Sequence, residues 1–100
     1  MSRRAARTDG NHAGLVKELR AIGANVFDAS GFGEGFPDLV VAYQRVNYLV
    51  EVKDPDKPPS KRKLTPAQKK FFAAWAGPRF VVETLEGFLE EVNRHEKRVV

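Results

Sequence analysis

The 100-residue chain contains no cysteine and only two histidines. The absence of thiols excludes disulfide bonds, thiolate metal sites and a cysteine nucleophile, and two imidazoles are too few for a histidine-rich zinc site. Oxygen ligands must therefore dominate any metal site. The chain also lacks a run of about 18–20 apolar residues that could span a membrane, and its arginine-rich start lacks the apolar core of a signal peptide. We expect an intracellular, cytoplasmic protein with no membrane partner.

The charge balance is moderately basic. Seventeen Lys and Arg residues against thirteen Asp and Glu residues give a formal net charge of +4 and a pI near 9.6, which is compatible with binding to nucleic acid or another anionic surface. The first eight residues, "MSRRAART", are basic without an apolar period and predict a flexible tail over residues 1–8. Because residues 9–100 contain no obvious linker, we expect them to form a single domain.

Apolar periodicity and turn residues predict seven regular elements in the order α-β-β-β-α-β-α, which is an α/β fold with a small mixed sheet flanked by helices. Asp9 or Asn11 can cap the first helix, and Gly23 can end it. The glycine-rich residues 30–37 and the proline-rich residues 54–64 are predicted loops. The expected helices are at 11–22, 65–78 and 84–97, and the expected strands are at 24–29, in a hairpin over 38–54, and at 79–83.

The helix predicted at 65–78 has the clearest local signals. Thr65 is a suitable N-cap, and Pro66 fits the first helical position. Gln68, three residues after the cap, can complete a capping box, and Gly77 with Pro78 can end the helix.

The stretch "GFPDLVVAYQRVNYLVEVKD" has the alternation of a β-hairpin, yet it carries charges that a hairpin core does not need. If residues 44–47 form the turn, Asp38 lies opposite Lys53 and Val40 lies opposite Glu51. Directly opposed residues share a face of the sheet, so these four side chains project from one face. A slip of one residue would separate Asp38 from Glu51 and Lys53. The opposite face then carries Leu39, Val50 and Val52.

Two carboxylates and an ammonium at one end of a hairpin are suited to metal-assisted phosphodiester hydrolysis. Asp38 and Glu51 can hold a hard divalent cation through oxygen, and the carbonyl of Val52 can add another oxygen. Lys53 can orient the attacking water or stabilise the transition state. The alternative is a surface salt-bridge cluster, in which the charges discourage edge-to-edge aggregation.

The segments "FPDL", "YLVEVKD" and "LTPAQKKF" resemble the VRR-NUC domain family of the PD-(D/E)xK nuclease superfamily, and the likeness spans about residues 9–94. This resemblance implies a restriction-endonuclease-like α-β-β-β-α-β core, dependence on Mg²⁺ or Mn²⁺, and endonuclease activity on DNA. It also implies site roles. Asp38 and Glu51 would be metal ligands together with the Val52 carbonyl, Lys53 would be the catalytic lysine, and Gln68 would complete the site from the following helix.

Two positions leave alternatives open. Gln68 also fits a purely structural role as the capping partner of Thr65, and we do not expect one side chain to fill both roles at once. In the first helix, similar nucleases carry an acid where this chain has Gly14. Asn11, His12 and Glu18 are candidates to replace that acid. Their alternative roles are a helix cap, a surface imidazole and a solvated charge.

Short stand-alone domains of this kind resemble Holliday-junction resolvases, which implies branched DNA as substrate, a homodimer, and a phage or prophage origin. A two-fold dimer suits a symmetric junction because it presents two copies of the site in a fixed relation. The aromatic residues of "FFAAWAGPRF" are candidates for an interface or for the core. Four basic residues near the site are predicted to contact DNA phosphates. They are Lys57, Lys61, Arg62 and Lys63. The alternative is that they belong to a solvated loop without a binding role.

Three functional hypotheses follow from the sequence. The first is a metal-dependent, structure-specific DNA endonuclease. The second is a nuclease fold that binds DNA, with steep salt dependence, but that has lost catalysis because the first helix lacks its acid. The third is a small protein-interaction domain with a charged hairpin.

Overall fold

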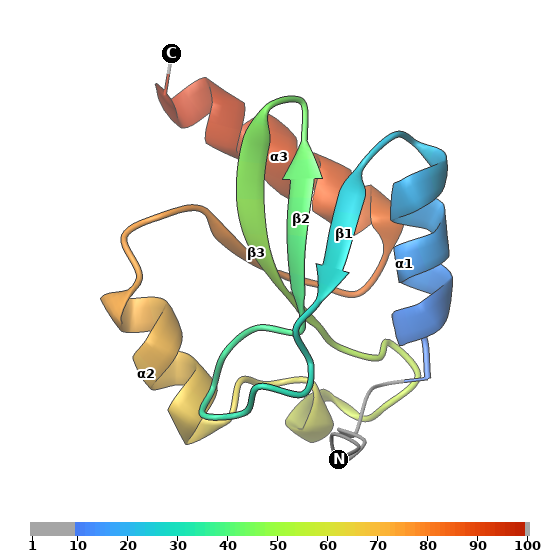
Figure 1. The fold of residues 1–100 in the computed structure, drawn as a ribbon. Coiled ribbons are helices and arrows are strands. Elements are labelled where there is room, and N and C mark those ends of the chain that lie inside the picture. Colours follow the sequence, from blue (N-terminus) through green and yellow to red (C-terminus); the bar gives the residue numbers. More distant parts are fainter. Residues whose placement is uncertain (1–9, 100) are drawn as a thin grey trace, which may run out of the picture.

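The computed structural model describes residues 10–99. The predicted basic tail, residues 1–8, and the alternative cap Asp9 lie outside this range. The elements follow in the predicted order (Figure 1). They are α1 (His12–Ala21), β1 (Asn25–Asp28), β2 (Leu39–Tyr43), β3 (Val46–Val52), a 3₁₀ turn η1 (Pro59–Lys61), α2 (Pro66–Ala74), β4 (Arg79–Val82) and α3 (Leu85–Val99).

The four strands form one mixed sheet in the order β1-β2-β3-β4. The β1–β2 and β2–β3 pairs are antiparallel, whereas β4 runs parallel to β3. A parallel neighbour requires a crossover connection, and the segment from η1 to α2 supplies it. This small mixed sheet with helices on either side confirms the predicted fold class.

The hairpin between β2 and β3 has a different register from the one predicted. Tyr43 pairs with Val46, so the turn contains only Gln44 and Arg45, and Leu39 pairs with Val50. Both turn residues have positive φ, at 51° and 72°, as in the two-residue turns whose twist matches that of the strands. The prediction was wrong by two residues. Because side chains alternate with a period of two, this shift leaves every residue on its predicted face.

One face of the sheet carries the hydrophobic core. Leu39, Val41 and Val50 are fully buried there, and they pack against helices α1 and α3. Helix α2 contributes no buried residue, so it lies outside this core. The side chains that α1 and α3 contribute are Leu15, Leu19, Phe88 and Val92. The opposite face of the sheet is left free for polar groups next to α2.

None of the helices within residues 10–99 is long and apolar enough to cross a bilayer.

Candidate active site

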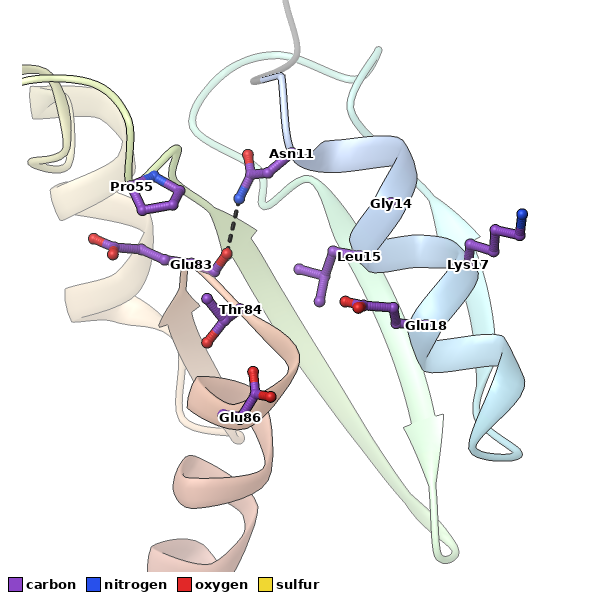
Figure 2. A pocket seen from close by; sticks show the side chains of 9 residues that line it. All are labelled: Asn11, Gly14, Leu15, Lys17, Glu18, Pro55, Glu83, Thr84 and Glu86. Carbon is purple, nitrogen blue, oxygen red and sulfur yellow. Dashed lines mark hydrogen bonds between the residues drawn. The ribbon is translucent and has the colours of Figure 1, made fainter.

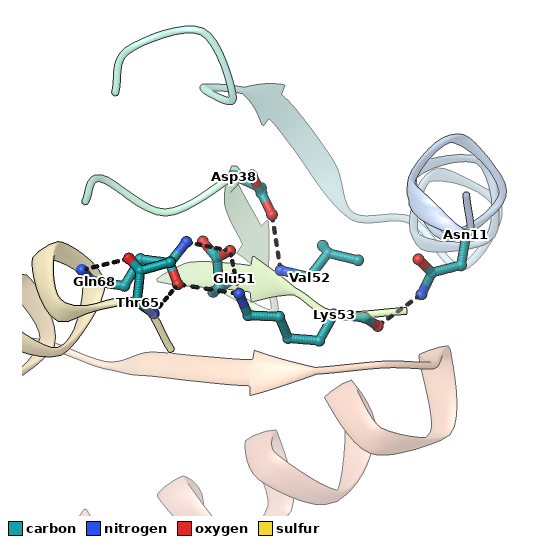
Figure 3. A network of polar contacts seen from close by, with 7 residues as sticks. All are labelled: Asn11, Asp38, Glu51, Val52, Lys53, Thr65 and Gln68. Atoms are coloured by element: carbon teal, nitrogen blue, oxygen red, sulfur yellow. Dashed lines mark hydrogen bonds and ion pairs between the residues drawn. The ribbon is translucent and has the colours of Figure 1, made fainter. Parts of the chain in front are cut away.

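Asp38 and Glu51 lie side by side at the ends of β2 and β3. In the observed register, Asp38 comes one step before the Leu39–Val50 pair, which places it next to Glu51. One carboxylate oxygen of Asp38 accepts a hydrogen bond from the backbone N–H of Val52 at 3.0 Å. Figure 3 shows both carboxylates on the face of the sheet that looks towards the start of α2. The predicted convergence of these two acids is therefore present.

Glu51 is a buried carboxyl group with one unsatisfied oxygen. The residue is 3% exposed. Its Oε2 accepts a hydrogen bond from Gln68 Nε2 at 2.8 Å, but its Oε1 is buried without any hydrogen-bond partner. Burial, and then the negative charge of Asp38, raise the pKa of Glu51 to about 8, although Lys53 acts in the opposite direction. Two carboxylates are thus held together with too little positive charge to balance them.

These residues fit a hard divalent cation. A buried carboxylate oxygen without a partner, next to a second carboxylate, is the environment that a cation would complete. The N–H of Val52 points towards Asp38, and the C=O of the same residue in an extended strand points to the same side. Within residues 10–99 no group of three or more His, Cys, Asp or Glu side chains is placed to hold a metal. Two carboxylates with a carbonyl suit Mg²⁺, which keeps several of its waters.

Lys53 follows Glu51 and Val52 in the chain, and its ammonium group lies beside Glu51. Its side chain is 10% exposed, and its Nζ lies 3.5 Å from Glu51 Oε2. The ammonium also donates a hydrogen bond to Gln68 Oε1 at 3.0 Å. Both contacts fix the position of the ammonium group, which is therefore ordered beside the two carboxylates rather than solvated.

Gln68 both caps α2 and joins the site. Its backbone N–H donates to Thr65 Oγ1 at 3.2 Å, while its Oε1 accepts from the backbone N–H of Thr65 at 2.9 Å. These two bonds form the predicted capping box. The amide oxygen has two lone pairs, so it accepts from Lys53 as well, and the amide nitrogen remains to donate to Glu51. One side chain therefore makes the capping bonds and also contacts Lys53 and Glu51, which we had not expected.

Asn11 fastens the start of α1 to the ends of two strands. It occupies the N-cap position, but its side chain makes no capping bond. Instead its Nδ2 donates to the backbone oxygens of Lys53 at 3.0 Å and Glu83 at 2.8 Å. The predicted capping role of this side chain is therefore wrong, and the residue instead connects helix α1 to the backbone of Lys53.

His12 is buried rather than at the surface. It is 6% exposed, and its Nε2 lies 3.1 Å from a carboxylate oxygen of Asp28 at the end of β1. Asp28 pairs with Leu39, so it lies on the core face of the sheet, opposite to Asp38. The alternative of a surface imidazole was wrong, and His12 belongs to the other face of the sheet.

Gly14 and Glu18 line a separate groove of about 510 Å³ between α1 and the start of α3 (Figure 2). A side chain at Gly14 would meet nothing within 4 Å. Glu18 is exposed, as its alternative role as a solvated charge predicts. Within residues 10–99, neither Glu18 nor His12 joins Asp38 and Glu51 in a group of three metal-ligand side chains.

The predicted phosphate-binding cations differ in their surroundings. Lys61 and Lys63 are exposed. Arg62 is half-buried and lies 3.4 Å from a carboxylate oxygen of Glu83, which ties the loop to the end of β4. Lys57 is exposed at the start of the same loop. Lys61 and Lys63 therefore lie exposed in the loop that leads into α2, and Arg62 is in contact with Glu83.

The role of Gly35 was not predicted from the sequence. This residue has a φ of +82°, and a Cβ atom there would clash with the backbone oxygen of Ala67 in the first turn of α2. The glycine-rich loop therefore packs directly against the start of the helix that carries Gln68. Its position as the last of three closely spaced glycines, two residues before Pro37, was the available signal, but the sequence of a loop does not indicate which residues the loop contacts.

Replacing Gly35 with alanine is expected to destabilise the fold by about 2–4 kcal/mol, because the new methyl group adds a clash to the cost of a left-handed backbone. Gly33→Ala is the matched control, since Gly33 also has a positive φ, +74°, but has open space around it. Urea unfolding should show a loss for Gly35→Ala that exceeds the loss for Gly33→Ala by at least about 1 kcal/mol. Equal losses would show that the loop does not press against α2.

Comparison with known proteins assigns the chain to a family. The family model of the VRR-NUC domain matches residues 6–89. A solved structure described as a VRR_NUC domain is 26% identical in sequence, with a TM-score of 0.61 over 91% of this chain and 98% of that one. Among curated proteins, none matches. The match over most of the sequence, together with the site at the ends of β2 and β3, shows that the chain belongs to the VRR-NUC domain family.

Proposed function

We propose that this nuclease-type domain is a metal-dependent endonuclease that hydrolyses phosphodiester bonds in DNA, and that its substrate is branched DNA such as a Holliday junction. The observation that carries the proposal is the unpartnered, buried Oε1 of Glu51 beside Asp38. VRR-NUC domains generally use divalent metals. Buried polar atoms usually have a hydrogen-bond partner, so a salt-bridge cluster without further function gives no reason for this unsatisfied oxygen.

The residues of the site divide the work as follows. Asp38, Glu51 and the Val52 carbonyl would hold Mg²⁺ or Mn²⁺, which would supply charge neutralisation at the phosphate and a lowered pKa for a bound water. Lys53 places a positive charge beside the carboxylates, where it can stabilise negative charge that develops on the phosphate. Gln68 holds both Lys53 and Glu51 in place.

A second candidate is a nuclease fold that binds DNA without cutting it. The specific observation in its favour is the empty space at Gly14, where similar nucleases carry an acid. Three oxygen donors are nevertheless enough for one Mg²⁺ ion, because this ion is commonly bound through one or two carboxylates and water. We therefore place the cutting enzyme first.

Cleavage of end-labelled DNA separates the two candidates. Four-way junction, flap and linear duplex are each incubated with Mg²⁺, Mn²⁺ or a chelator. The parent protein is expected to cut the junction fastest and only with metal, and Lys53→Ala is expected to lower the rate by about 10²–10³-fold while DNA binding persists. DNA binding by the parent without cleavage under any of these conditions would favour the second candidate.

The exposed lysines of the loop before α2 give a separate test of DNA as the partner. Each phosphate contact releases condensed counterions, so Lys61→Ala and Lys63→Ala should each lower the slope of log affinity against log salt by about 1 for duplex DNA. Lys17→Ala is the matched control, because Lys17 is exposed on α1, beside the separate groove. If the slope of log affinity against log salt is the same in all three variants and the parent, this loop does not contact the DNA.

The homodimer belongs to the same proposal, because a symmetric junction is cut at two equivalent positions. Sedimentation of the full chain is expected to show a dimer at the concentrations at which it cuts the junction. A monomer that cuts both strands of the junction would contradict this part of the proposal.

A further inference from the structure

Five aromatic rings form a continuous row beside the site. Phe27 lies on β1, Phe32 and Phe36 lie in the glycine-rich loop, Phe71 lies on α2, and Trp75 follows that helix directly. Each ring centroid is 5.2–6.2 Å from the next. The last pair, Phe71 and Trp75, is stacked, with an angle of 16° between the ring planes. We call these five residues the aromatic row.

The aromatic row is unusually exposed for a set of rings that contact one another. Phe27 and Phe32 are each 56% exposed, and Trp75 is 41% exposed. The other large apolar side chains at the surface of residues 10–99 are the aliphatic Ile22 and Val81, so every strongly exposed aromatic ring belongs to this row. A contiguous set of exposed aromatic rings is uncommon on the surface of a soluble protein and indicates a binding site.

The aromatic row runs into the site from two directions. Phe27 pairs with Val40, and Val40 lies two residues after Asp38, so Phe27 shares a sheet face with Asp38 and Glu51. At the other end, Phe71 lies one helical turn after Gln68 and therefore on the same side of α2. A strand of nucleic acid whose phosphate reaches Asp38 and Glu51 thus has rings within reach on both sides.

We propose that the aromatic row binds the unpaired bases of a DNA strand by stacking, and so selects DNA that has splayed or single-stranded bases next to the scissile phosphate. This inference rests on the proposed function, because it names the substrate feature that the same site would select. Two observations favour bases over a protein partner. The Phe27 end of the row shares a sheet face with Asp38 and Glu51, and the exposed Lys61 and Lys63 lie in the loop that leads into α2, where their charges complement a phosphate backbone. Stacking on aromatic rings accepts any base, which suits recognition of structure rather than sequence.

The fluorescence of Trp75 provides a direct test, because it is the only tryptophan of the chain. The parent protein is titrated, with chelator present to prevent cutting, with a short single-stranded oligonucleotide, an abasic oligonucleotide of equal length, and a blunt duplex. We expect the single strand to quench the fluorescence and to bind about tenfold more tightly than the abasic strand. Equal affinity for the normal and the abasic strand would overturn the proposal.

Substitutions of Phe32 separate stacking from general apolar contact. Phe32→Leu keeps an apolar side chain but removes the ring, and it should weaken binding of the single strand about tenfold, while Phe32→Tyr should bind as the parent does. Ile22→Ala, at an exposed apolar position outside the row, is the control and should change nothing. Sedimentation of the same variants distinguishes a subunit interface. If Phe32→Leu separates a dimer but binds the single strand as the parent does, the row is a protein interface and the proposal is wrong.

The binding test of the aromatic row can succeed or fail independently of the cleavage test. If the parent quenches and discriminates as expected but cuts no DNA, the proposed endonuclease fails and the base-stacking surface stands. If the parent cuts branched DNA but does not distinguish the abasic strand, the endonuclease stands and the stacking surface fails.

Discussion

Glu51→Gln is expected to abolish metal-dependent cleavage and, at the same time, to stabilise the metal-free protein. The amide cannot supply an anionic oxygen to a metal, so the rate should fall by at least about 10³-fold, equivalent to the several kcal/mol that a catalytic metal contributes. The gain in stability arises because the carboxylate of Glu51 is buried beside Asp38 with Oε1 unpaired, whereas glutamine has no charge to bury.

The pH dependence of this gain has a definite sign. The pKa of Glu51 is raised from its ordinary value of 4.5 to about 8 in the fold, so between these two values the folded state holds a proton that the unfolded state has released. The free energy of unfolding of the parent therefore falls as pH rises from about 4.5 to 8, and it levels off above that range. Glutamine does not titrate. The advantage of Glu51→Gln should grow across the same window and reach on the order of 3 kcal/mol, or about 15 °C in Tm.

Thermal unfolding at several pH values, with and without Mg²⁺, measures both parts of this prediction. Added Mg²⁺ should raise the Tm of the parent at pH 8 but leave that of Glu51→Gln unchanged, because only the parent binds the ion. Glu90→Gln is the matched control, since Glu90 is an exposed glutamate on α3. A Glu51→Gln variant that is less stable than the parent at pH 8 would show that the carboxylate is compensated within the fold and does not need a cation.

Gln68→Ala is expected to lower cleavage by about 10²-fold or more, although its cost in stability should be only about 1 kcal/mol. The stability cost is that of a lost helix cap. The larger effect on rate arises because the amide of Gln68 bonds both Lys53 Nζ and Glu51 Oε2. Without it, two charged groups of the site lose their fixed positions, and small misplacements of catalytic groups are costly.

Thr65→Ala is the control that removes the cap alone. Its hydroxyl accepts the backbone N–H of Gln68, and it makes no contact with Lys53 or Glu51 among the hydrogen bonds of residues 10–99. It should lose a similar amount of stability in urea unfolding while keeping cleavage within a few-fold of the parent. Equal losses of cleavage in Thr65→Ala and Gln68→Ala would mean that Gln68 acts only through the stability of α2.

Much of the site could be predicted because it depends on local rules. Side chains alternate along a strand, so an error of two residues in the hairpin register still assigns Asp38 and Glu51 to the same face of the sheet. The capping signals around Thr65 and Gln68 also depend only on neighbouring residues. The register itself was missed because Gln44 and Arg45 lack the Asn-Gly or Asp-Gly signal of a two-residue turn.

Contacts between distant segments could not be predicted in the same way. Asn11 is a residue type that commonly caps helices, but its side chain donates hydrogen bonds to backbone oxygens 42 and 72 residues away. His12 is buried because the end of β1 brings Asp28 next to it. The aromatic row joins rings from β1, a loop and α2. The sequence signal for an exposed aromatic surface was limited to Phe32 and Phe36, which lie in the otherwise polar, glycine-rich loop. Each of these depends on how the sheet and helices pack, which sequence periodicity does not specify.

The most direct test of a divalent metal site at Asp38 and Glu51 is the binding of Mn²⁺ to the parent protein and to Asp38→Asn, measured in solution without DNA by electron paramagnetic resonance. The asparagine oxygen can still accept the N–H of Val52 that Asp38 accepts now, so the fold should persist while one anionic ligand is lost. We expect the parent to bind Mn²⁺ and the variant to bind it at least about tenfold more weakly. Equal binding by both proteins, or none by the parent, would contradict a metal centre at the ends of β2 and β3.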